Sequence, residues 1–408
     1  MSEWQKVNLG DCCEITSSKR IFFSEYVESG IPFYRSKEII EKGKGEEISH
    51  PLYISKEKYD EIKGKYGVPQ KGDLLLTAVG SLGIPFVVKD DSPFYFKDGN
   101  LVWLKHFQDI DPIFLYYWIK SENGYNALYN IAIGSAQKAL TIAAIKGYEI
   151  PLPPLQTQHR IATILSRYDS LIENYQKQIK LLEEVAQRLY KEWFVDLRFP
   201  GHENTNIIDG VPEGWEMKNI SGVCEMIGAG STPSRRNNAY WDNGNIRWVK
   251  TKELLDNWIF DTEEYITEEG LNNSSTKIFP VNTILMAIYA SPTLGRLGIL
   301  AQECCCNQAA LGLVANENLI SWVWLYLKLY ELRDEFNAVA RGAGQQNISG
   351  VVVKNWEIIV PDKTTIEDFT KITKPYFETS RSLQSQLRLL AEARDRLLPK
   401  LMSGEITV

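Results

Sequence analysis

The sequence predicts an α/β protein with two repeated mixed α/β domains. They are joined by two long helices that pair as an antiparallel coiled coil with pseudo-two-fold symmetry. The chain has 408 residues, too many for one ordinary core. A passage that begins at Gly134 recurs at Gly342, 208 residues later. Each copy precedes a helical stretch whose apolar residues recur at alternating spacings of three and four.

The repeat extends over the whole chain. The passages GSAQKALTIAAIKGYEIPLP and GAGQQNISGVVVKNWEIIVP share their Gly, Gln, Lys, aromatic-Glu-Ile and Pro positions. WQKVNLGDCCEI from Trp4 matches WEMKNISGVCEM from Trp215, and IPFYRSKEI from Ile31 matches IRWVKTKEL from Ile246. One unit is therefore written twice. The predicted parts are a first domain (1–154), a first helix (155–200), a second domain (201–362) and a second helix (363–408).

Short apolar runs predict the strands of each domain. DLLLTAV, FVVKD and TILMAIY are bounded by Gly, Pro, Asn and Ser clusters, as strands of a mixed α/β domain are. Residues 114–119 and 322–330 are instead expected to form helices within the domains.

The helical stretches predict a coiled-coil seam, because apolar residues occupy two rows that each repeat every seven residues. A helix of about 35 residues is roughly 50 Å long and extends beyond a domain of this size. We therefore expect the two helices to pair with each other, although packing against their own domains is the alternative. Thr373, Ser380 and Arg394 interrupt the second seam, and Pro375 predicts that the helix restarts there. The seam residues are Leu165, Tyr168, Ile172, Tyr175, Ile179, Leu182 and Leu189 in the first stretch, and Tyr376, Leu383, Leu387, Leu390 and Leu397 in the second.

Charge argues against binding of polyanions by bulk attraction. The formal net charge is −7. Residues 1–154 carry 18 basic and 20 acidic side chains, whereas residues 201–362 carry 12 and 20. Any surface for nucleic acid must therefore be local.

The six cysteines predict neither a zinc site nor a disulfide framework. They lie at residues 12–13, 224 and 304–306, without a Cys-x-x-Cys pair, and the chain has only four His. We expect reduced, mostly buried thiols of a cytoplasmic protein. The N-terminal MSEWQKVNLGD has no apolar core of a signal peptide, and no run is long enough to span a membrane, so a soluble protein is expected.

Three segments resemble the specificity subunit of type I restriction-modification systems. They are EIPLPPLQTQHRIATIL from Glu149, IGAGSTPSRRNNAYWDNGNIRWVK from Ile227, and ARDRLLPKLMSGEI near the C-terminus. The resemblance covers essentially the whole chain. It implies a non-catalytic subunit whose two target recognition domains each read one half of a bipartite site in double-stranded DNA.

The resemblance also implies partners. Two adenine methyltransferase subunits would dock on the helices, and restriction and motor subunits would complete the complex. S-adenosylmethionine, ATP and Mg²⁺ would belong to those partners, with no cofactor or metal on this chain. In agreement, the sequence has no Gly-x-x-x-x-Gly-Lys-Ser/Thr phosphate loop and no Asn/Asp-Pro-Pro-Tyr methyltransferase signature.

Candidate DNA contacts are basic and amide residues that recur in loops of both copies. Lys and Arg neutralise phosphates, and Arg, Asn and Gln read base edges. Gln137 and Gln345 are the best single pair, since Gln reads adenine bidentately, but either could instead tie down its own loop. For each candidate, a solvated charge or a structural turn is an equally good interpretation. The candidates are Lys19, Arg20, Arg35, Lys37, Ser81, Gln137 and Lys138 in the first domain, and Ser231, Thr232, Arg235, Arg236, Lys250, Lys252, Arg296, Gln345, Gln346 and Asn347 in the second.

Two other classes of function remain open. A coiled-coil scaffold that binds proteins and no DNA agrees with the acidic charge, but not with the duplicated basic and Gln-bearing loops. An enzyme with an unrecognised site would be active as the purified chain alone. If both domains bind DNA, they should read different sequences, because residues 42–71 are rich in Lys whereas residues 256–269 are rich in Asp and Glu. The site would then be asymmetric.

Overall fold

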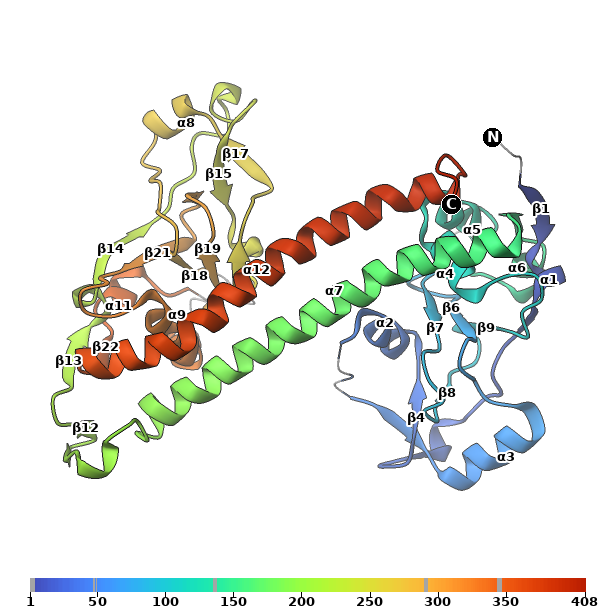
Figure 1. Cartoon of the computed structure of the whole chain (residues 1–408), viewed down its shortest axis with the longest axis horizontal. Coiled ribbons are helices and arrows are strands. Elements are labelled where there is room, and N and C mark those ends of the chain that lie inside the picture. Colours follow the sequence, from blue (N-terminus) through green and yellow to red (C-terminus); the bar gives the residue numbers. More distant parts are fainter. Residues whose placement is uncertain (1–3, 47, 49, 135–137, 290–292, 343–346) are drawn as a thin grey trace. The chain divides into compact units, whose positions relative to one another are not determined.

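The computed structural model describes residues 4–46, 48, 50–134, 138–289, 293–342 and 347–408. Contacts divide the chain into unit 1, comprising Met1–Asn174 and Arg388–Val408, and unit 2, comprising Tyr175–Leu387. Each unit contains an α/β domain and one end of each of the two long helices (Figure 1). The long helices are α7 (Leu155–Tyr190) and α12 (Lys363–Met402).

Unit 1 is built on two small sheets. One has the strand order β2-β9-β6-β7 with antiparallel neighbours, and the other has the order β3-β5-β4-β8 with a parallel β4–β8 pair. A separate β1–β10 pair holds the start of the domain beside the strand that leads into α7. The strands are β1 (Gln5–Asn8), β2 (Glu14–Thr16), β3 (Tyr26–Val27), β4 (Ile31–Tyr34), β5 (Leu52–Ile54), β6 (Leu74–Thr77), β7 (Pro85–Val87), β8 (Tyr95–Phe96), β9 (Leu101–Lys105) and β10 (Glu149–Leu152).

Unit 2 repeats this order of elements. Its sheets are β14-β21-β18-β19-β16 and β17-β15-β20, and a separate β13–β22 pair again precedes the long helix. The chief difference is that β16 extends one sheet of unit 2, whereas β3 extends one sheet of unit 1. The strands are β13 (Glu216–Asn219), β14 (Cys224–Ala229), β15 (Ile246–Val249), β16 (Asn257–Ile259), β17 (Glu264–Ile266), β18 (Ile284–Ala287), β19 (Leu297–Leu300), β20 (Cys305–Cys306), β21 (Ala310–Ala315) and β22 (Glu357–Val360), with a hairpin of β11 (Ile207–Ile208) and β12 (Val211–Pro212) before them.

The shorter helices follow the same repeat. Those of unit 1 are α1 (Leu9–Cys12), α2 (Ser36–Lys44), α3 (Lys56–Tyr66), α4 (Pro112–Lys120), α5 (Glu122–Asn130) and α6 (Ile142–Lys146), with the 3-10 turn η1 (Phe23–Glu25). Those of unit 2 are α8 (Glu268–Asn272), α9 (Trp322–Glu331), α10 (Arg333–Gly342) and α11 (Gly350–Lys354), with the 3-10 turns η4 (Ile220–Gly222), η5 (Asn238–Tyr240) and η6 (Thr251–Glu253). The predicted repeat of mixed α/β domains is confirmed.

The central strand of each domain is apolar throughout because both of its faces are buried. In β6, Leu74 and Leu76 pack into a core with α4, whereas Leu75 packs into a second core on the opposite face. In β18, Ile284 and Met286 likewise pack into one core, whereas Leu285 packs into another on the opposite face. A continuous apolar run is what burial on both faces requires. The predicted strands in DLLLTAV and TILMAIY are confirmed.

The two predicted helices within the domains are also confirmed, and their first residues show why they start where they do. At α4, the Asp111 carboxylate accepts hydrogen bonds from the backbone N–H groups of Ile113 (2.6 Å) and Phe114 (3.1 Å). At α9, the Ser321 hydroxyl accepts one from the Trp324 N–H (3.2 Å). Asp and Ser satisfy the free N–H groups of a first helical turn, so both helices begin at a polar cap.

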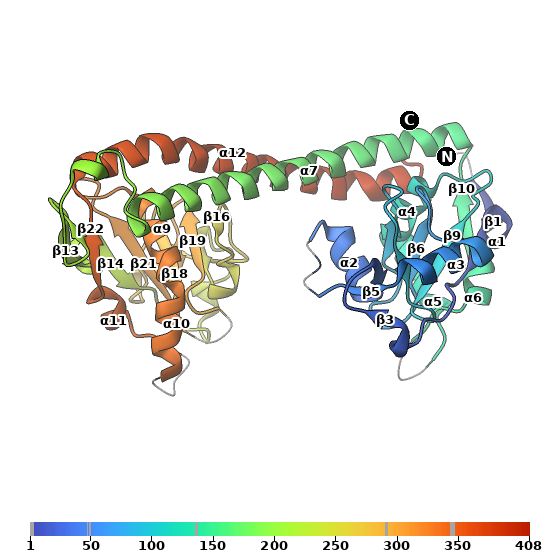
Figure 2. The ribbon, with the colours of Figure 1, turned by 90° about the horizontal axis from the view of Figure 1, so that it is seen from below.

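The two long helices are antiparallel, as predicted. In unit 1, Arg394 of α12 contacts Asp169 of α7. In unit 2, the Tyr175 hydroxyl of α7 donates to the Gln386 side chain of α12 (3.0 Å), and the Tyr190 ring packs edge-on against the Phe369 ring. As residue numbers rise along α7, those of its partners in α12 fall. Within unit 2, the two helices lie side by side along the sheets (Figure 2).

Burial differs between the two rows of the seam. On α7, Leu165, Ile172 and Ile179 are buried, whereas Tyr168, Tyr175, Leu182 and Leu189 are half-buried. On α12, Leu383 is buried, and Tyr376, Leu387, Leu390 and Leu397 are half-buried. Much of this burial is against the domains, since Leu165 belongs to the core of unit 1 and Tyr190 to that of unit 2.

The predicted restart of the second helix at Pro375 is wrong. The helix α12 is continuous from Lys363 to Met402, with Pro375 in its interior and exposed. Proline lacks one N–H donor and crowds the preceding turn. Here neighbouring residues fix the turn: Thr373 is fully buried, and its hydroxyl donates to the Phe369 carbonyl (2.8 Å). Packing against unit 2 therefore outweighs the local cost of the proline.

All six cysteines are free thiols, and five are buried. Burial raises the pKa of Cys13 and of Cys224 to about 12 in each case, so neither is a reactive thiolate at neutral pH. Among the residues that the structure describes, no helix is both long and apolar enough to cross a membrane.

Candidate nucleic-acid interface

In unit 1, one turn of residues 97–100 gathers several predicted DNA-contacting segments. The Arg20 Nε lies 2.9 Å from the Asp98 carboxylate. The Ser36 hydroxyl donates to the Asn100 carbonyl (3.3 Å), and so does the backbone N–H of Ala78 (2.8 Å). The loops that carry Arg20, Arg35 with Lys37, and Ser81 therefore converge on this turn. We call residues 97–100 the unit 1 turn.

Unit 2 contains the equivalent turn, residues 307–310, which we call the unit 2 turn. The Thr232 hydroxyl hydrogen-bonds to the Gln308 side chain. The backbone N–H of Gly230 donates to the Ala310 carbonyl (3.0 Å), and that of Ile288 donates to the Ala309 carbonyl (2.9 Å). The backbone N–H of Asn307 donates to the Val249 carbonyl (3.0 Å), next to Lys250. The same three loops thus meet in both units, but an ion pair in unit 1 is replaced by a neutral hydrogen bond in unit 2.

The repeated RSKE and KTKE sequences form the entrance to a helical turn in each domain. The Glu38 carboxylate accepts from the backbone N–H of Arg35 (2.8 Å), at the start of α2. The Glu253 carboxylate accepts from the backbone N–H of Lys250 (2.7 Å), at the start of η6. A Glu at the third helical position that bonds back to the cap residue is one half of a capping box. Sequence reasoning missed both glutamates, although their spacing was visible.

Ion pairs hold several of the predicted cations. Arg35 pairs with Glu38, Lys37 lies 3.5 Å from Glu41, and Lys252 lies 2.6 Å from Glu263. Lys250 contacts Glu264 (2.8 Å) and Glu263 (3.0 Å). The hydrogen bonds with Glu264 and Glu263 raise the pKa of Lys250 above its usual value. DNA phosphates would have to compete with these carboxylates.

Arg235 lies over the Trp241 ring and beside Trp248, two rings that pack edge-on against each other. The centre of its guanidinium lies 3.6 Å from the Trp241 ring centroid and 5.0 Å from that of Trp248. The same group pairs with Glu264. Cation–π contacts and an ion pair fix its plane, so the structural interpretation of Arg235 gains support.

The remaining candidates vary in their surroundings. The Ser231 carbonyl accepts from the Trp248 indole (2.9 Å), which favours a structural role. Lys138 Nζ lies 3.7 Å from the centroid of the Tyr129 ring, and Asn347 forms an isolated bridge with Tyr289. Ser81 is exposed. Gln137, Gln345 and Gln346 lie outside the described residues.

Four predicted cations have no acidic partner in the part of the chain that the structure describes. They are Lys19, Lys138, Arg236 and Arg296. Lys19 and Arg236 are exposed, and Lys19 Nζ lies 4.5 Å from the centroid of the Tyr66 ring. These are the cations best able to meet a polyanion without breaking an internal ion pair.

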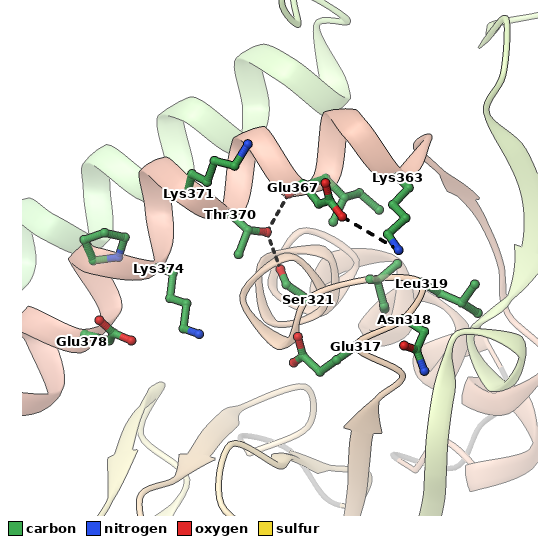
Figure 3. Close-up of a pocket in the computed structure, with 13 residues that line it drawn as sticks. Glu317, Asn318, Leu319, Ser321, Lys363, Glu367, Thr370, Lys371, Lys374 and Glu378 are labelled. Atoms are coloured by element: carbon green, nitrogen blue, oxygen red, sulfur yellow. Dashed lines mark hydrogen bonds and ion pairs between the residues drawn. The ribbon is translucent and has the colours of Figure 1, made fainter.

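A separate hollow of about 450 Å³ lies in unit 2 between α12 and the loop that precedes α9 (Figure 3). Within it, the Thr370 hydroxyl donates to the Ser321 hydroxyl (2.8 Å) and so fastens α12 to the start of α9. The hollow contains no predicted DNA-contacting residue. Among the described side chains, no group of three His, Cys, Asp or Glu could hold a metal ion. The charges that line the hollow are mixed: Lys363, Lys371, Lys374, Glu317, Glu367 and Glu378.

Unit 1 fastens its long helix differently at the position equivalent to Ile366. Gln158 is fully buried there, and its side-chain oxygen accepts from the Asp111 N–H (2.9 Å). Its amide donates to the carbonyls of Pro153 (2.8 Å) and Asp109 (3.0 Å). Sequence reasoning quoted Gln158 in a motif but gave it no role, because its partners lie up to 49 residues away.

Comparisons with known proteins agree with the repeat. The model of a family described as "Type I restriction modification DNA specificity domain" matches residues 1–184 and 212–388. The type I restriction enzyme MjaIX specificity subunit of Methanocaldococcus jannaschii is 28% identical over 83% of this chain and 78% of its own length. The HindI specificity subunit of Haemophilus influenzae is 23% identical over 100% of both chains. The crystal structure of a type I restriction-modification S subunit from M. genitalium has the same fold, with a TM-score of 0.67 and 16% identity over 98% of this chain and 96% of that one.

Proposed function

The chain belongs to the type I restriction-modification DNA specificity family, and from that premise we propose that its two domains read the two halves of a bipartite, asymmetric DNA site. The observation that carries the proposal is the pair of equivalent turns. Each gathers the same polar loops, but Arg20 with Asp98 in unit 1 stands where Thr232 with Gln308 stands in unit 2. Equivalent scaffolds with different side chains suit two different half-sites.

In this proposal the chain is a non-catalytic subunit of a larger complex. Two adenine methyltransferase subunits dock on the long helices, and restriction and motor subunits join them. S-adenosylmethionine, ATP and Mg²⁺ are bound and used by those partner subunits. Support comes from large apolar side chains that α7 and α12 leave exposed, which suit coverage by a partner. They are Leu155, Leu171, Leu181, Val185, Ile372 and Leu389.

Single-molecule methylome sequencing of the source organism, with and without this gene, tests the function. We expect one bipartite N6-methyladenine motif to disappear when the gene is deleted. Restoring the gene should restore the motif, whereas a methylome that is identical in both strains would refute the proposal. A gel-shift assay with and without methyltransferase subunits separates it from the scaffold alternative, which predicts no shift in either case.

The long helices are proposed to set the length of the spacer between the half-sites. At 1.5 Å per residue, a heptad adds about 10 Å, equivalent to about three base pairs at 3.4 Å each. We expect one extra heptad in both helices, placed after Asn174 and after Leu387, to lengthen the preferred spacer by about three base pairs. These insertion points are the boundaries between the two units.

The motif methylated by the heptad variant is read by the same sequencing. As a control, the heptad is inserted into α7 alone, which leaves the two helices unmatched in length and should abolish methylation. Methylation at the original spacing by the double insertion would contradict the ruler.

A further inference from the structure

Two adjacent phenylalanines at the start of η1 are exposed to solvent. The side chain of Phe22 is 61% exposed and that of Phe23 is 87% exposed. Single exposed apolar residues are ordinary on protein surfaces, but two neighbouring aromatic rings form a patch that gains substantially from burial. The tip formed by residues 22–23 is therefore a candidate contact surface of unit 1.

This tip is held in place. The Glu25 carboxylate accepts from the backbone N–H of Phe22 (2.7 Å) and lies 3.0 Å from Lys58 Nζ. The Phe23 ring packs edge-on against Tyr26, with centroids 5.6 Å apart, and Tyr26 in turn packs against the buried Phe33. Glu25 satisfies the turn and Tyr26 anchors it to the core. The exposed rings are therefore presented from a fixed support.

The charges beside the tip indicate an anionic partner. Lys19 and Arg20 precede it in the same loop and are both exposed, and Lys19 has no acidic partner among the described residues. The nearby Glu25 is balanced by Lys58. Arg20 links the loop to the unit 1 turn through Asp98. The apolar tip is thus continuous with the candidate DNA interface and flanked by cations that could neutralise phosphates.

Unit 2 provides an internal comparison. The turn η5 occupies the place of η1, because both lie the same distance before the matching strands β15 and β4. By that spacing, Asn237 and Asn238 of unit 2 correspond to Phe22 and Phe23. The repeated fold thus accepts polar residues at this turn, and the two rings are a property of unit 1 alone.

We propose that Phe23, supported by Phe22, inserts between neighbouring base pairs of the half-site that the first domain reads. Apolar side chains that insert this way unstack one base step and bend the duplex, and the cost depends on the sequence of that step. The first domain would then select its half-site partly by how easily one step opens. This inference rests on the proposed function and adds a way of reading that the second domain lacks.

The test uses the full chain in complex with its methyltransferase subunits, and DNA that carries the methylated motif. The Phe22→Asn/Phe23→Asn double variant introduces the residues of unit 2. We expect it to bind this DNA about ten-fold to one-hundred-fold more weakly, the range of one lost base–aromatic stack. Phe22→Leu/Phe23→Leu keeps an apolar wedge and should lose much less. Ile208→Asn removes another exposed apolar residue, 68% exposed in unit 2, and should bind as the wild type does.

Fluorescence of 2-aminopurine separates insertion into the duplex from a role of the two rings in stabilising the fold of unit 1. The base is placed in turn at each step of both half-sites. The wild-type complex should brighten it at one step of the half-site that the first domain reads, and the Asn variant should lose that signal while the fluorescence at every other position stays unchanged. An Asn variant with wild-type affinity and fluorescence would overturn the inference. So would loss of methyltransferase binding with unchanged DNA affinity, which would assign the tip to a protein partner. If the wild-type complex binds no bipartite DNA, the proposed function fails together with the inference.

Discussion

Replacing Arg394 with alanine will lower the free energy of unfolding of the protein by about 3 kcal/mol, because it leaves a partly buried carboxylate without its cation. The Arg394 guanidinium lies 2.6 Å from Asp169, and their side chains are 22% and 27% exposed. The same carboxylate accepts a hydrogen bond from the Tyr117 hydroxyl (2.7 Å). The three side chains join α12, α7 and α4 within unit 1. Urea unfolding followed by circular dichroism measures the loss, and hydrogen exchange should place it in unit 1.

The repeat supplies a matched control for this prediction. A shift of 208 residues carries Asp169 onto Phe377 and Arg394 onto Ala186, which are both buried in the core of unit 2. The triple variant Asp169→Phe/Arg394→Ala/Tyr117→Phe should therefore recover most of the lost stability, since an apolar set can replace a buried ion pair at little net cost. A single variant as stable as the wild type, or a triple variant less stable than the single one, would contradict the account.

The same network shows which part of the fold a sequence can predict. Several strands and helices follow from local patterns, such as the apolar run of β6 and the apolar residues 114–119 of α4, and these predictions hold. The place of Arg394 in the helix pair does not follow from local pattern, because its partner Asp169 is 225 residues away. In the sequence, Arg394 therefore looked like an interruption of the apolar seam. Pro375 misled for a related reason: its local cost was visible, whereas the packing that outweighs it was not.

The candidate interface has a similar division. Sequence reasoning named candidate loops, and the structure brings several of them to the unit 1 and unit 2 turns. It could not tell which cations are already paired, since Arg235 depends on Trp241, Trp248 and Glu264, brought together only by folding. The exposed pair Phe22–Phe23 was also missed, because apolar residues in a sequence are presumed buried. Only the folded structure shows that both side chains are exposed.

A second large effect is expected in unit 2, where Glu183 of α7 lines a small hollow. Its lining includes Asp256, Trp258, Tyr326 and Gln384. Asp256 is paired with Arg333. Burial, followed by repulsion from Asp256, raises the pKa of Glu183 to about 7. The carboxyl therefore carries a proton in the native protein at a pH where it is ionised in the unfolded chain.

The sign of the pH dependence follows from proton counts. Between about pH 4.5 and pH 7, the native state binds more protons at Glu183 than the unfolded state does, so this residue lowers stability as the pH rises across that window. Above pH 7 the loss is complete and constant. We expect Glu183→Gln to raise the free energy of unfolding at pH 8 by about 2 kcal/mol relative to the wild type, and to change it little at pH 4.5.

The neighbouring Glu184 separates this effect from a general change in helix charge. Glu184 lies 3.9 Å from Lys180 and 3.7 Å from Arg188, which are surface ion pairs of small energy. Glu184→Gln should therefore change stability by less than about 0.5 kcal/mol, with no step between pH 4.5 and pH 7. If Glu183→Gln also changes stability by less than about 0.5 kcal/mol with no step, the pKa of Glu183 is not raised in the native protein and the account is wrong. If it shows the step, a titrating carboxyl lies where α7 and α12 pack on the second domain, and protonation strengthens that packing.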